Sequence, residues 1–498
     1  MRRVVSLFLP TWPTDRFRRR NGGPARDEPI VTAVREGSRR VLACVDAAAR
    51  ALGLTPGMTV AHAQALVPGL QMIEATPEED AEALGRLALW CLRYAPIVAP
   101  DPPDGVLVDI AGAAHLHGGE AALLRDLVRR LRRTGLDAKV AVADTAGAAW
   151  AMARYGSQGV VPPGATAPAI SELPLEALRL PRETVESLRA AGFERIGEIV
   201  EKPKAPFIRR FGPELVRRLD QALGREPDPI EPLFPADTPT RRRAFAEPIG
   251  APEVLERVTA DLVRDLCRDL EGRGEGARRL DLVFRRVDNL RQGVRIATAR
   301  PSRDPRHLLR LFGERLGLVD LGFGIEEAVL MASVVEPFAH SQIVGRYVAE
   351  EDAEADLGDL VDRVAVRLAA NAPYRLTPVE SRMPERSVRK APPLGAVTTA
   401  AWPARLPRPP LLVDPPEPIV ALNSDQPPKM FTWRGKRRGV AKADGPERIH
   451  GEWWTCDDEM FLVRDYYRVE TEAGERFWLF RDAPAAQGGR WFLHGVFA

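Results

Sequence analysis

Residues 101–119, DPPDGVLVDIAGAAHLHGG, contain a short β-branched apolar run that is bounded on both sides by turn-forming residues. The run Val106–Ile110 has the length and composition of a buried strand, with Asp109 inside it. Asp104 precedes the run, and a carboxylate at the start of a buried strand is where a two-metal nucleotidyl-transfer site is built. The next residue is Gly105, which has no side chain that could bind a metal.

A second apolar run lies near the N-terminus. Val4–Leu9 (VVSLFL) is expected to form a strand, Pro10 follows it, and no carboxylate occurs before Asp15. A phosphoryl-transfer site needs about two or three carboxylates that converge on Mg²⁺. Because the two strands together supply only Asp104 at the expected positions, the sequence predicts neither a metal site nor a catalytic residue here.

These two runs resemble the palm of Y-family (translesion) DNA polymerases, whose first strand carries Asp-x-Asp and whose later segment carries Ser-x-Asp-Glu before an apolar strand. On that pattern Phe8 and Pro10 stand at the two N-terminal carboxylates, and Gly105 stands at the Glu. Only Asp104 matches. The segment 104–120, DGVLVDIAGAAHLHGGE, is more similar to the ImuB family, polymerase-like proteins of bacterial mutagenesis cassettes that have lost the catalytic carboxylates.

Composition limits the alternatives. The chain has 498 residues, which is too long for one core, so about three to five domains are expected. It is 45% hydrophobic and 28% charged, as is usual for a globular protein. Its formal net charge is only +2, so any contact with nucleic acid must come from local arginine clusters.

The lack of targeting signals and the spacing of the cysteines predict a cytoplasmic protein. No apolar run approaches the roughly 18 residues that are needed to span a membrane. The N-terminal MRRVVSLFLP lacks the small-residue cleavage site of a signal peptide. The four cysteines, Cys44, Cys91, Cys267 and Cys456, are far apart and have neither metal-ligand nor disulfide-framework spacing. We therefore expect a reducing cytoplasmic compartment and no bound cofactor.

The periodicity predicts a multidomain α/β and α+β chain. After the fingers-like segment come a helix, a strand, a helix, a strand and a helix, an alternation that fits an α/β palm (helices 76–94, 120–134 and 144–155; strands 106–110 and 138–143). The family resemblance implies the remaining division. It gives residues 1–10 and 76–165 as palm-like, 11–75 as fingers-like, 170–226 as thumb, 241–340 as little finger, 341–429 as a proline-rich tether with a short helix, and 430–498 as a C-terminal, mainly β aromatic module.

The fingers-like segment departs from active polymerases. The resemblance implies that a Tyr and an Arg hold the incoming triphosphate there; Ala47 takes the Tyr position and Arg50 keeps the Arg. Nucleotide binding by Arg50 is therefore doubtful, and a solvated helix face is the alternative. Two further positions that carry phosphate-facing lysines in active relatives are the apolar Ala146 and Trp150.

The thumb-like segment contains LRAAGFERIGEIV at 188–200, which has the form of a helix-hairpin-helix. Such a hairpin turns backbone N–H groups toward a DNA phosphate without reading sequence. The candidate contacts are Gly192, Arg195 and Gly197. A helical packing module without DNA contact is the alternative.

The little-finger segment contains two half-buried strands with a basic face. Period-two alternation at Leu280, Leu282 and Phe284, and again at Val294 and Ile296, predicts the strands. A basic sheet face fits the DNA backbone, whereas a solvated arginine face is the alternative. The candidate DNA contacts are Arg278, Arg279, Arg285, Arg286, Arg291 and Arg295.

A sliding-clamp peptide is implied by the resemblance and is incomplete in the residues. Family members carry Gln-Leu-x-Leu-Phe after the little finger, where this chain has EPFAHSQIVGRY at 336–347. Gln342 and Ile343 match its start, but residues 344–346 do not complete the apolar anchor. The segment 307–312, HLLRLF, has the Leu-Phe end, and its helical spacing favours core packing.

The C-terminal residues 430–498 are rich in aromatic side chains and resemble the C-terminal module of ImuB proteins. In that family the region after the little finger recruits the RecA-like partner ImuA and an error-prone C-family DNA polymerase. The candidate partner-binding residues are Trp453, Trp454, Trp478 and Trp491. Core packing is the alternative, because a small β module needs large side chains to bury enough surface.

These features together predict a non-catalytic scaffold for mutagenic translesion synthesis in the SOS response to DNA damage. It would bind primer-template DNA and the sliding β clamp and recruit a separate polymerase. One rival is an active Y-family polymerase that uses substitute ligands among Asp15, Asp101, Asp104 and Asp109. A second rival is a DNA-binding repair factor without a polymerase partner, which would have no need of the C-terminal module.

Overall fold

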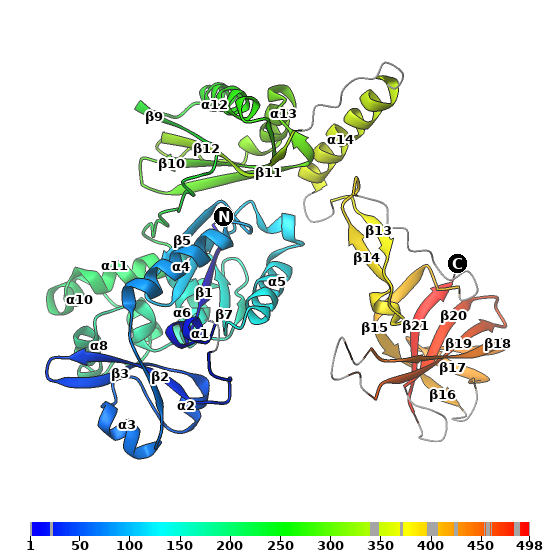
Figure 1. Cartoon of the computed structure of the whole chain (residues 1–498), viewed down its shortest axis with the longest axis horizontal. Coiled ribbons are helices and arrows are strands. Elements are labelled where there is room, and N and C mark those ends of the chain that lie inside the picture. The colour runs from blue at the N-terminus through cyan, green and yellow to red at the C-terminus, as the bar shows by residue number, and fades with distance from the viewer. Residues whose placement is uncertain are drawn as a thin grey trace. The chain divides into compact units, whose positions relative to one another are not determined.

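The structure is a computed structural model in which the chain forms two compact units, 1–372 and 373–498 (Figure 1). It describes residues 2–19, 23–338, 348–368, 372–395, 407–422, 427–452, 454, 459, 461–482 and 489–497, with only the backbone of 348–356 and 422. Within these residues, none of the helices combines the length and the apolar character that crossing a membrane requires.

The palm is a five-stranded sheet whose central strand is buried on both faces. In spatial order the strands are β5 (Ile97–Asp101), β6 (Gly105–Asp109), β1 (Val4–Phe8), β7 (Lys139–Ala143) and β8 (Gly159–Val160). β1 is antiparallel to both β6 and β7. A strand covered on both faces favours a nearly continuous apolar sequence, and β1 is apolar except for the buried Ser6. The predicted α/β palm is confirmed.

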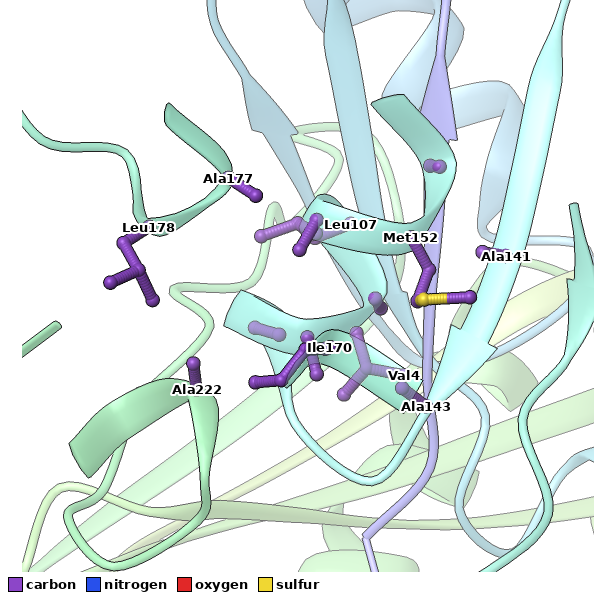
Figure 2. Close-up of a cluster of buried hydrophobic side chains, with 14 of the residues drawn as sticks. Val4, Leu107, Ala141, Ala143, Met152, Ile170, Ala177, Leu178 and Ala222 are labelled. Carbon is purple, nitrogen blue, oxygen red and sulfur yellow. The ribbon is translucent and has the colours of Figure 1, made fainter. Parts of the chain in front are cut away.

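Different helices cover the two faces of the palm sheet. Val5 and Leu7 pack in one buried cluster with α4 (Pro77–Cys91) and α5 (Glu120–Arg133). Val4 lies in another cluster with α6 (Ala146–Tyr155) and the thumb, as Figure 2 shows for Val4, Met152 and Ala222. Because side chains alternate along a strand, Phe8 also lies on the α6 side, where it packs against the second cluster.

The fingers and thumb are small modules attached to the palm. The fingers comprise a three-stranded sheet in the order β3-β2-β4 with two short helices and their own core. The thumb is helical, and its predicted hairpin joins α8 to α9 through Gly192, whose φ is 89°. The element bounds are α1 (Trp12–Arg18), β2 (Ile30–Glu36), β3 (Arg39–Val45), α2 (Ala47–Ala51), α3 (Val60–Leu66), β4 (Gln71–Glu74), α7 (Thr166–Ser171), α8 (Arg182–Ala190), α9 (Gly197–Val200), α10 (Lys204–Phe211) and α11 (Pro213–Ala222).

The little finger has the predicted order strand, helix, strand, strand, helix, strand. Its sheet runs β11-β10-β12-β9, and two helices cover one face, where Leu280, Leu282 and Phe284 are buried. Helix α14 (Val348–Leu368) follows and packs against β11 and α13. The bounds are β9 (Thr240–Ile249), α12 (Pro252–Gly272), β10 (Glu275–Arg286), β11 (Arg291–Ser302), α13 (Pro305–Leu316) and β12 (Ile325–Pro337).

The C-terminal unit is a seven-stranded antiparallel sheet with an additional hairpin. Its spatial order is β15 (Leu411–Pro418), β21 (Trp491–Phe497), β20 (Arg476–Arg481), β19 (Val463–Thr471), β18 (Lys436–His450), β17 (Met430–Trp433) and β16 (Val420–Leu422). The hairpin is formed by β13 (Arg375–Pro378) and β14 (Val388–Ala391). The expected mainly β aromatic module is confirmed.

The structure differs from the predicted tether over residues 341–429. Four strands lie in that range, and the compact C-terminal unit begins at Pro373 instead of Met430. Prolines at 415, 416 and 418 suggested an extended linker, but β15 is an edge strand of the sheet. An edge strand accepts proline because its outward N–H groups have no neighbouring strand to bind.

Candidate functional site

The pairing of β1 with β6 brings the expected ligand positions of the palm to one corner. In the antiparallel register Phe8 lies opposite Gly105, and the Leu9 N–H donates to the Asp104 carbonyl oxygen at 2.8 Å. On the other side of β6, Asp101 lies opposite Gly105 across the β5–β6 turn. Side chains at positions 8, 101 and 104 therefore converge, as a two-metal site would require.

A guanidinium fills this corner. Arg154, in the last turn of α6, places an Nη2 atom 2.6 Å from Asp104 Oδ1 and 3.5 Å from Asp101 Oδ2. Its guanidinium carbon lies 4.5 Å from the centre of the Phe8 ring and 4.2 Å from that of Trp150. The side chain is only 8% exposed. Two carboxylates and two aromatic rings thus enclose one permanent cation.

Burial of the corner raises the pKa of the Asp101 carboxyl. Loss of solvation raises the pKa of this carboxyl, and the positive charges of Arg154 and Arg179 oppose that rise. Asp101 is part of the enclosed corner, with a side chain that is 17% exposed. Arg154 and Arg179 thus favour the ionised form of Asp101, whereas burial disfavours it.

The corner does not fit a divalent metal. A Cβ atom on Gly105 would lie 2.9 Å from Arg154 Nη2 and 2.9 Å from Asp101 Oδ2, so a side chain here would collide with the existing ion pair. Across the described parts of the chain, no group of three or more His, Cys, Asp or Glu side chains could hold a metal ion. A metal of the kind used by active Y-family palms would need ligands that Phe8 and Gly105 do not provide.

The other carboxylates that could substitute as ligands have structural roles elsewhere. Asp109 is buried at the far end of β6, where it accepts from Arg2 Nε at 2.9 Å and from the Ala111 N–H at 3.0 Å. Asp15 accepts from the Thr11 hydroxyl at 2.8 Å and from the Asp137 N–H at 3.2 Å. Neither of these carboxylates pairs with the Arg154 guanidinium.

Sequence reasoning missed Arg154. Its only signal is that it is the single charged residue in the otherwise uncharged helix Ala146–Tyr155. Trp150, one of the positions where a lysine was expected, is half-buried and forms part of the aromatic enclosure, whereas Ala146 is buried in the core. In the fingers Arg50 is exposed and donates to the Val45 carbonyl oxygen at 3.2 Å.

Three arginines of the predicted DNA-binding set are engaged inside the protein. Arg295 is 2% exposed, pairs with Asp281 at 2.6 Å, and donates to the Leu92 carbonyl oxygen of the palm at 2.7 Å. Arg286 pairs with two aspartates, and the 10% exposed side chain of Arg291 pairs with Glu231. These ion pairs and hydrogen bonds are made within the protein and leave the three side chains little exposed.

The other three arginines are half-buried, and Arg278 also donates to the Thr298 carbonyl oxygen. Arg278 and Arg285 are about one-third exposed or less and make ion pairs of 3.3 Å or longer. Arg279 has no carboxylate within ion-pair distance among the residues that the structure describes. Burial and the nearby Arg295 charge lower the pKa of Arg279 to about 10, so it remains a cation at neutral pH.

The thumb hairpin is exposed and partly occupied by its own carboxylate. Gly192 and Arg195 are exposed, and Gly197 is half-buried against Ser171. Glu198 Oε2 accepts from the backbone N–H groups of Glu194 at 2.7 Å and of Arg195 at 3.2 Å. A phosphate that binds these N–H groups would have to displace this carboxylate.

The clamp and partner candidates fall into two groups. Gln342, Ile343 and Trp453 lie outside the described residues. Trp478 and Trp491 are 1% and 6% exposed and belong to the cores of the C-terminal unit, whereas Trp454 is 67% exposed. In the little finger, Leu308, Leu311 and Phe312 of the second clamp-like segment are fully buried in the core, as expected.

Comparisons with known proteins match two segments to described families. Residues 23–154 match the impB/mucB/samB family (IMS), and residues 409–498 match a domain of unknown function, DUF6504. Among solved structures, DinB from Sulfolobus solfataricus is 14% identical with a TM-score of 0.38, covering 66% of this chain and 98% of that chain.

Two kinds of curated relative also match the chain. DNA polymerase IV of Dehalococcoides mccartyi (strain CBDB1) is 24% identical over 268 residues, which are 53% of this chain and 69% of that protein. Protein ImuB of Caulobacter vibrioides (strain NA1000 / CB15N) is 45% identical over 464 residues, which are 90% of this chain and 100% of that protein. Because this similarity extends along the full length of the relative, the chain belongs to the ImuB family.

Proposed function

We propose that this chain is a non-catalytic, polymerase-like scaffold for mutagenic translesion synthesis. It binds primer-template DNA and the sliding clamp, and it recruits an error-prone C-family polymerase and the RecA-like ImuA. The observation that carries the non-catalytic part is the palm corner, where Arg154 pairs with Asp104 and Phe8 and Gly105 stand in place of carboxylates. Two-metal nucleotidyl transfer has no ligand set there.

The DNA-binding part rests on accessible basic groups. Arg278, Arg279 and Arg285 of β10 are at least partly exposed, and the thumb hairpin presents Gly192 and Arg195 to solvent. Gly197 positions the second helix of that hairpin. These contacts address the DNA backbone, so binding is independent of sequence and falls steeply with salt. Arg291 and Arg295 contribute by linking the little finger to Glu231 and to the palm, whereas Arg286 pairs within the little finger.

The recruitment part rests on family membership and on the C-terminal unit. Protein ImuB of Caulobacter vibrioides shares that unit within its full-length similarity. Trp454 is the exposed aromatic candidate for partner contact, with Trp453 beside it in sequence, while Trp478 and Trp491 support the sheet beneath. Clamp binding is assigned to the segment that contains Gln342 and Ile343.

Primer extension tests the non-catalytic assignment. The full chain is incubated with undamaged and lesion-bearing primer-templates and Mg²⁺ or Mn²⁺, and binding to the same DNA is measured by fluorescence anisotropy. We expect binding without extension by the wild type and by Asp104→Ala. Extension that Asp104→Ala abolishes would instead identify an active Y-family polymerase with substitute ligands, in which Asp101 and Asp104 are the two carboxylates that converge.

A capture experiment tests recruitment. Immobilised full chain is presented with purified sliding clamp, ImuA and C-family polymerase, and compared with a chain that ends at residue 372, the boundary of the first compact unit. We expect the shorter chain to lose the polymerase and ImuA while it keeps DNA binding. Retention of both partners by the shorter chain would contradict the assignment of the C-terminal unit.

A further inference from the structure

The palm corner combines features that a merely vacant metal site would not have. Arg154 is the only charged side chain of α6, and it lies against both Asp101 and Asp104. Its Nη1 atom is buried and has no hydrogen-bond partner among the described residues, and the guanidinium instead lies over two aromatic faces. Phe8, one of these faces, stands where a carboxylate is expected.

We propose that Arg154 is a built-in cation that replaces the divalent metal of this corner, holding Asp101 and Asp104 together without an ion and excluding one. The proposal concerns ion binding alone. Its test is therefore independent of DNA binding and of partner recruitment.

Geometry and charge both support the exclusion of a divalent ion by Arg154. A divalent ion bound to Asp104 would sit about 2.0–2.6 Å from its oxygen, whereas Arg154 Nη2 already lies 2.6 Å from that oxygen. Two cations that share one oxygen would repel strongly in a partly buried site. Arg154 is the cation that contacts both carboxylates, and Arg179, which also acts on Asp101, is paired with Asp228. Removal of Arg154 would therefore leave Asp104 without its ion-pair partner and available to a metal ion.

Gly105 is coupled to the same cation. Because a Cβ at this position would lie 2.9 Å from Arg154 Nη2, a glutamate at 105 and the observed arginine position exclude each other. A side chain at position 105 would therefore require the Arg154 guanidinium to shift. Restoring carboxylates at positions 8 and 105 would not restore a metal site while Arg154 remains.

Mn²⁺ binding to the full-length chain tests the proposal. Binding is measured by the loss of the free-Mn²⁺ electron paramagnetic resonance signal, and thermal unfolding with and without Mn²⁺ provides a second readout. We expect no Asp104-dependent Mn²⁺ binding in the wild type. Arg154→Ala should bind one Mn²⁺ at least tenfold more tightly than the wild type and should unfold at a higher temperature when Mn²⁺ is present.

Matched variants distinguish Mn²⁺ binding at Asp104 from a general loss of packing. Asp104→Asn in the Arg154→Ala background should abolish the gained Mn²⁺ binding, and Arg154→Lys, which keeps the positive charge, should not gain it. Arg182→Ala is the control, because Arg182 pairs only with Glu186 on an exposed helix face and its side chain is 91% exposed.

A second neutral variant keeps the test decisive if alanine disrupts folding. Arg154→Gln retains most of the side-chain length between the Phe8 and Trp150 rings and removes the charge. Circular dichroism identifies which variants fold. Asp104-dependent Mn²⁺ binding by the wild type, or its absence from every folded neutral variant, would overturn the proposal.

Discussion

The side chain of Arg154 fills the space that a side chain at position 105 would need. Its guanidinium is held by Asp104 at 2.6 Å and by the rings of Phe8 and Trp150, so moving it aside would lengthen these contacts. Gly105 is itself buried, and its Cβ would also lie 3.1 Å from the Asp101 carbonyl oxygen. A substitution at position 105 should therefore change the free energy of unfolding.

Gly105→Ala should lower the free energy of unfolding by about 1–3 kcal/mol, because the added methyl group would displace the Arg154 and Asp101 side chains from their ion pair. Urea unfolding of the full chain measures the effect. In the Arg154→Ala background the same substitution should cost less, with a coupling energy of about 0.5 kcal/mol or more. Gly85→Ala in α4, where a Cβ meets no atom within 4 Å, is the matched control and should be neutral or stabilising.

His494 makes the C-terminal unit sensitive to acid. It is fully buried, contacts the Tyr466 hydroxyl at 2.8 Å, and stacks on Trp478. Burial lowers the pKa of His494 to about 4 from an ordinary value of 6.5, with Glu385 and Asp414 opposing this shift and Arg464 adding to it. The folded state therefore favours the neutral ring.

Stability should fall as the pH is lowered from 6.5 to 4, because the unfolded chain binds a proton on His494 in that window and the folded chain does not. The loss should reach up to about 3 kcal/mol at the acidic end. Urea unfolding at pH 7 and pH 5 measures it. His494→Gln should flatten this dependence and exposed His62→Gln should not; equal slopes for the wild type and His494→Gln would refute the assignment.

At the scale of elements, a carboxylate occupies backbone N–H groups of the thumb hairpin that we propose bind a DNA phosphate. Glu198 caps the backbone N–H groups of residues 194 and 195, and these hydrogen bonds hold the pKa of its carboxyl below the usual range. Its negative charge therefore sits where a DNA phosphate would bind.

Glu198→Ala should raise affinity for primer-template DNA by roughly two- to tenfold, because it frees two N–H donors and removes a repelling charge. Fluorescence anisotropy at several salt concentrations measures the change. Glu201→Ala removes the same charge three residues later and is the control for general electrostatics. If both substitutions raise the affinity equally, the hairpin N–H groups do not bind the phosphate.

Local patterns predicted most of the elements but not the contacts between them. The palm strands, the little-finger order and the thumb hairpin follow from periodicity and turn residues, which act over a few positions. The pairing of Arg154 with Asp104 joins residues 50 positions apart, and it exists only because α6 packs on the face of β1 that carries Phe8. The engagement of Arg295 with the palm is likewise a tertiary contact.

At the scale of the whole molecule, the boundary between the two units decides how the chain can be divided. A cut at Met430, the boundary that the sequence predicted, would leave β15 and β16 behind and remove β17, β18, β19, β20 and β21, their neighbours in the sheet. The sequence of β15 resembles a linker because an edge strand tolerates prolines. Its place in the sheet was therefore not predicted. A cut after residue 372 separates two units that each have their own core.

The two truncations should therefore behave differently. A chain of residues 1–372 should remain monomeric and unfold cooperatively, because it keeps its palm and little-finger clusters whole. A chain of residues 1–429 should aggregate, because β15 and β16 lose the strands they pair with and present unpaired edges. Size-exclusion chromatography with light scattering compares them at equal concentration. A well-behaved 1–429 chain would mean that β15 and β16 contribute little to the sheet, and the partner-binding region could then be narrowed to residues 430–498.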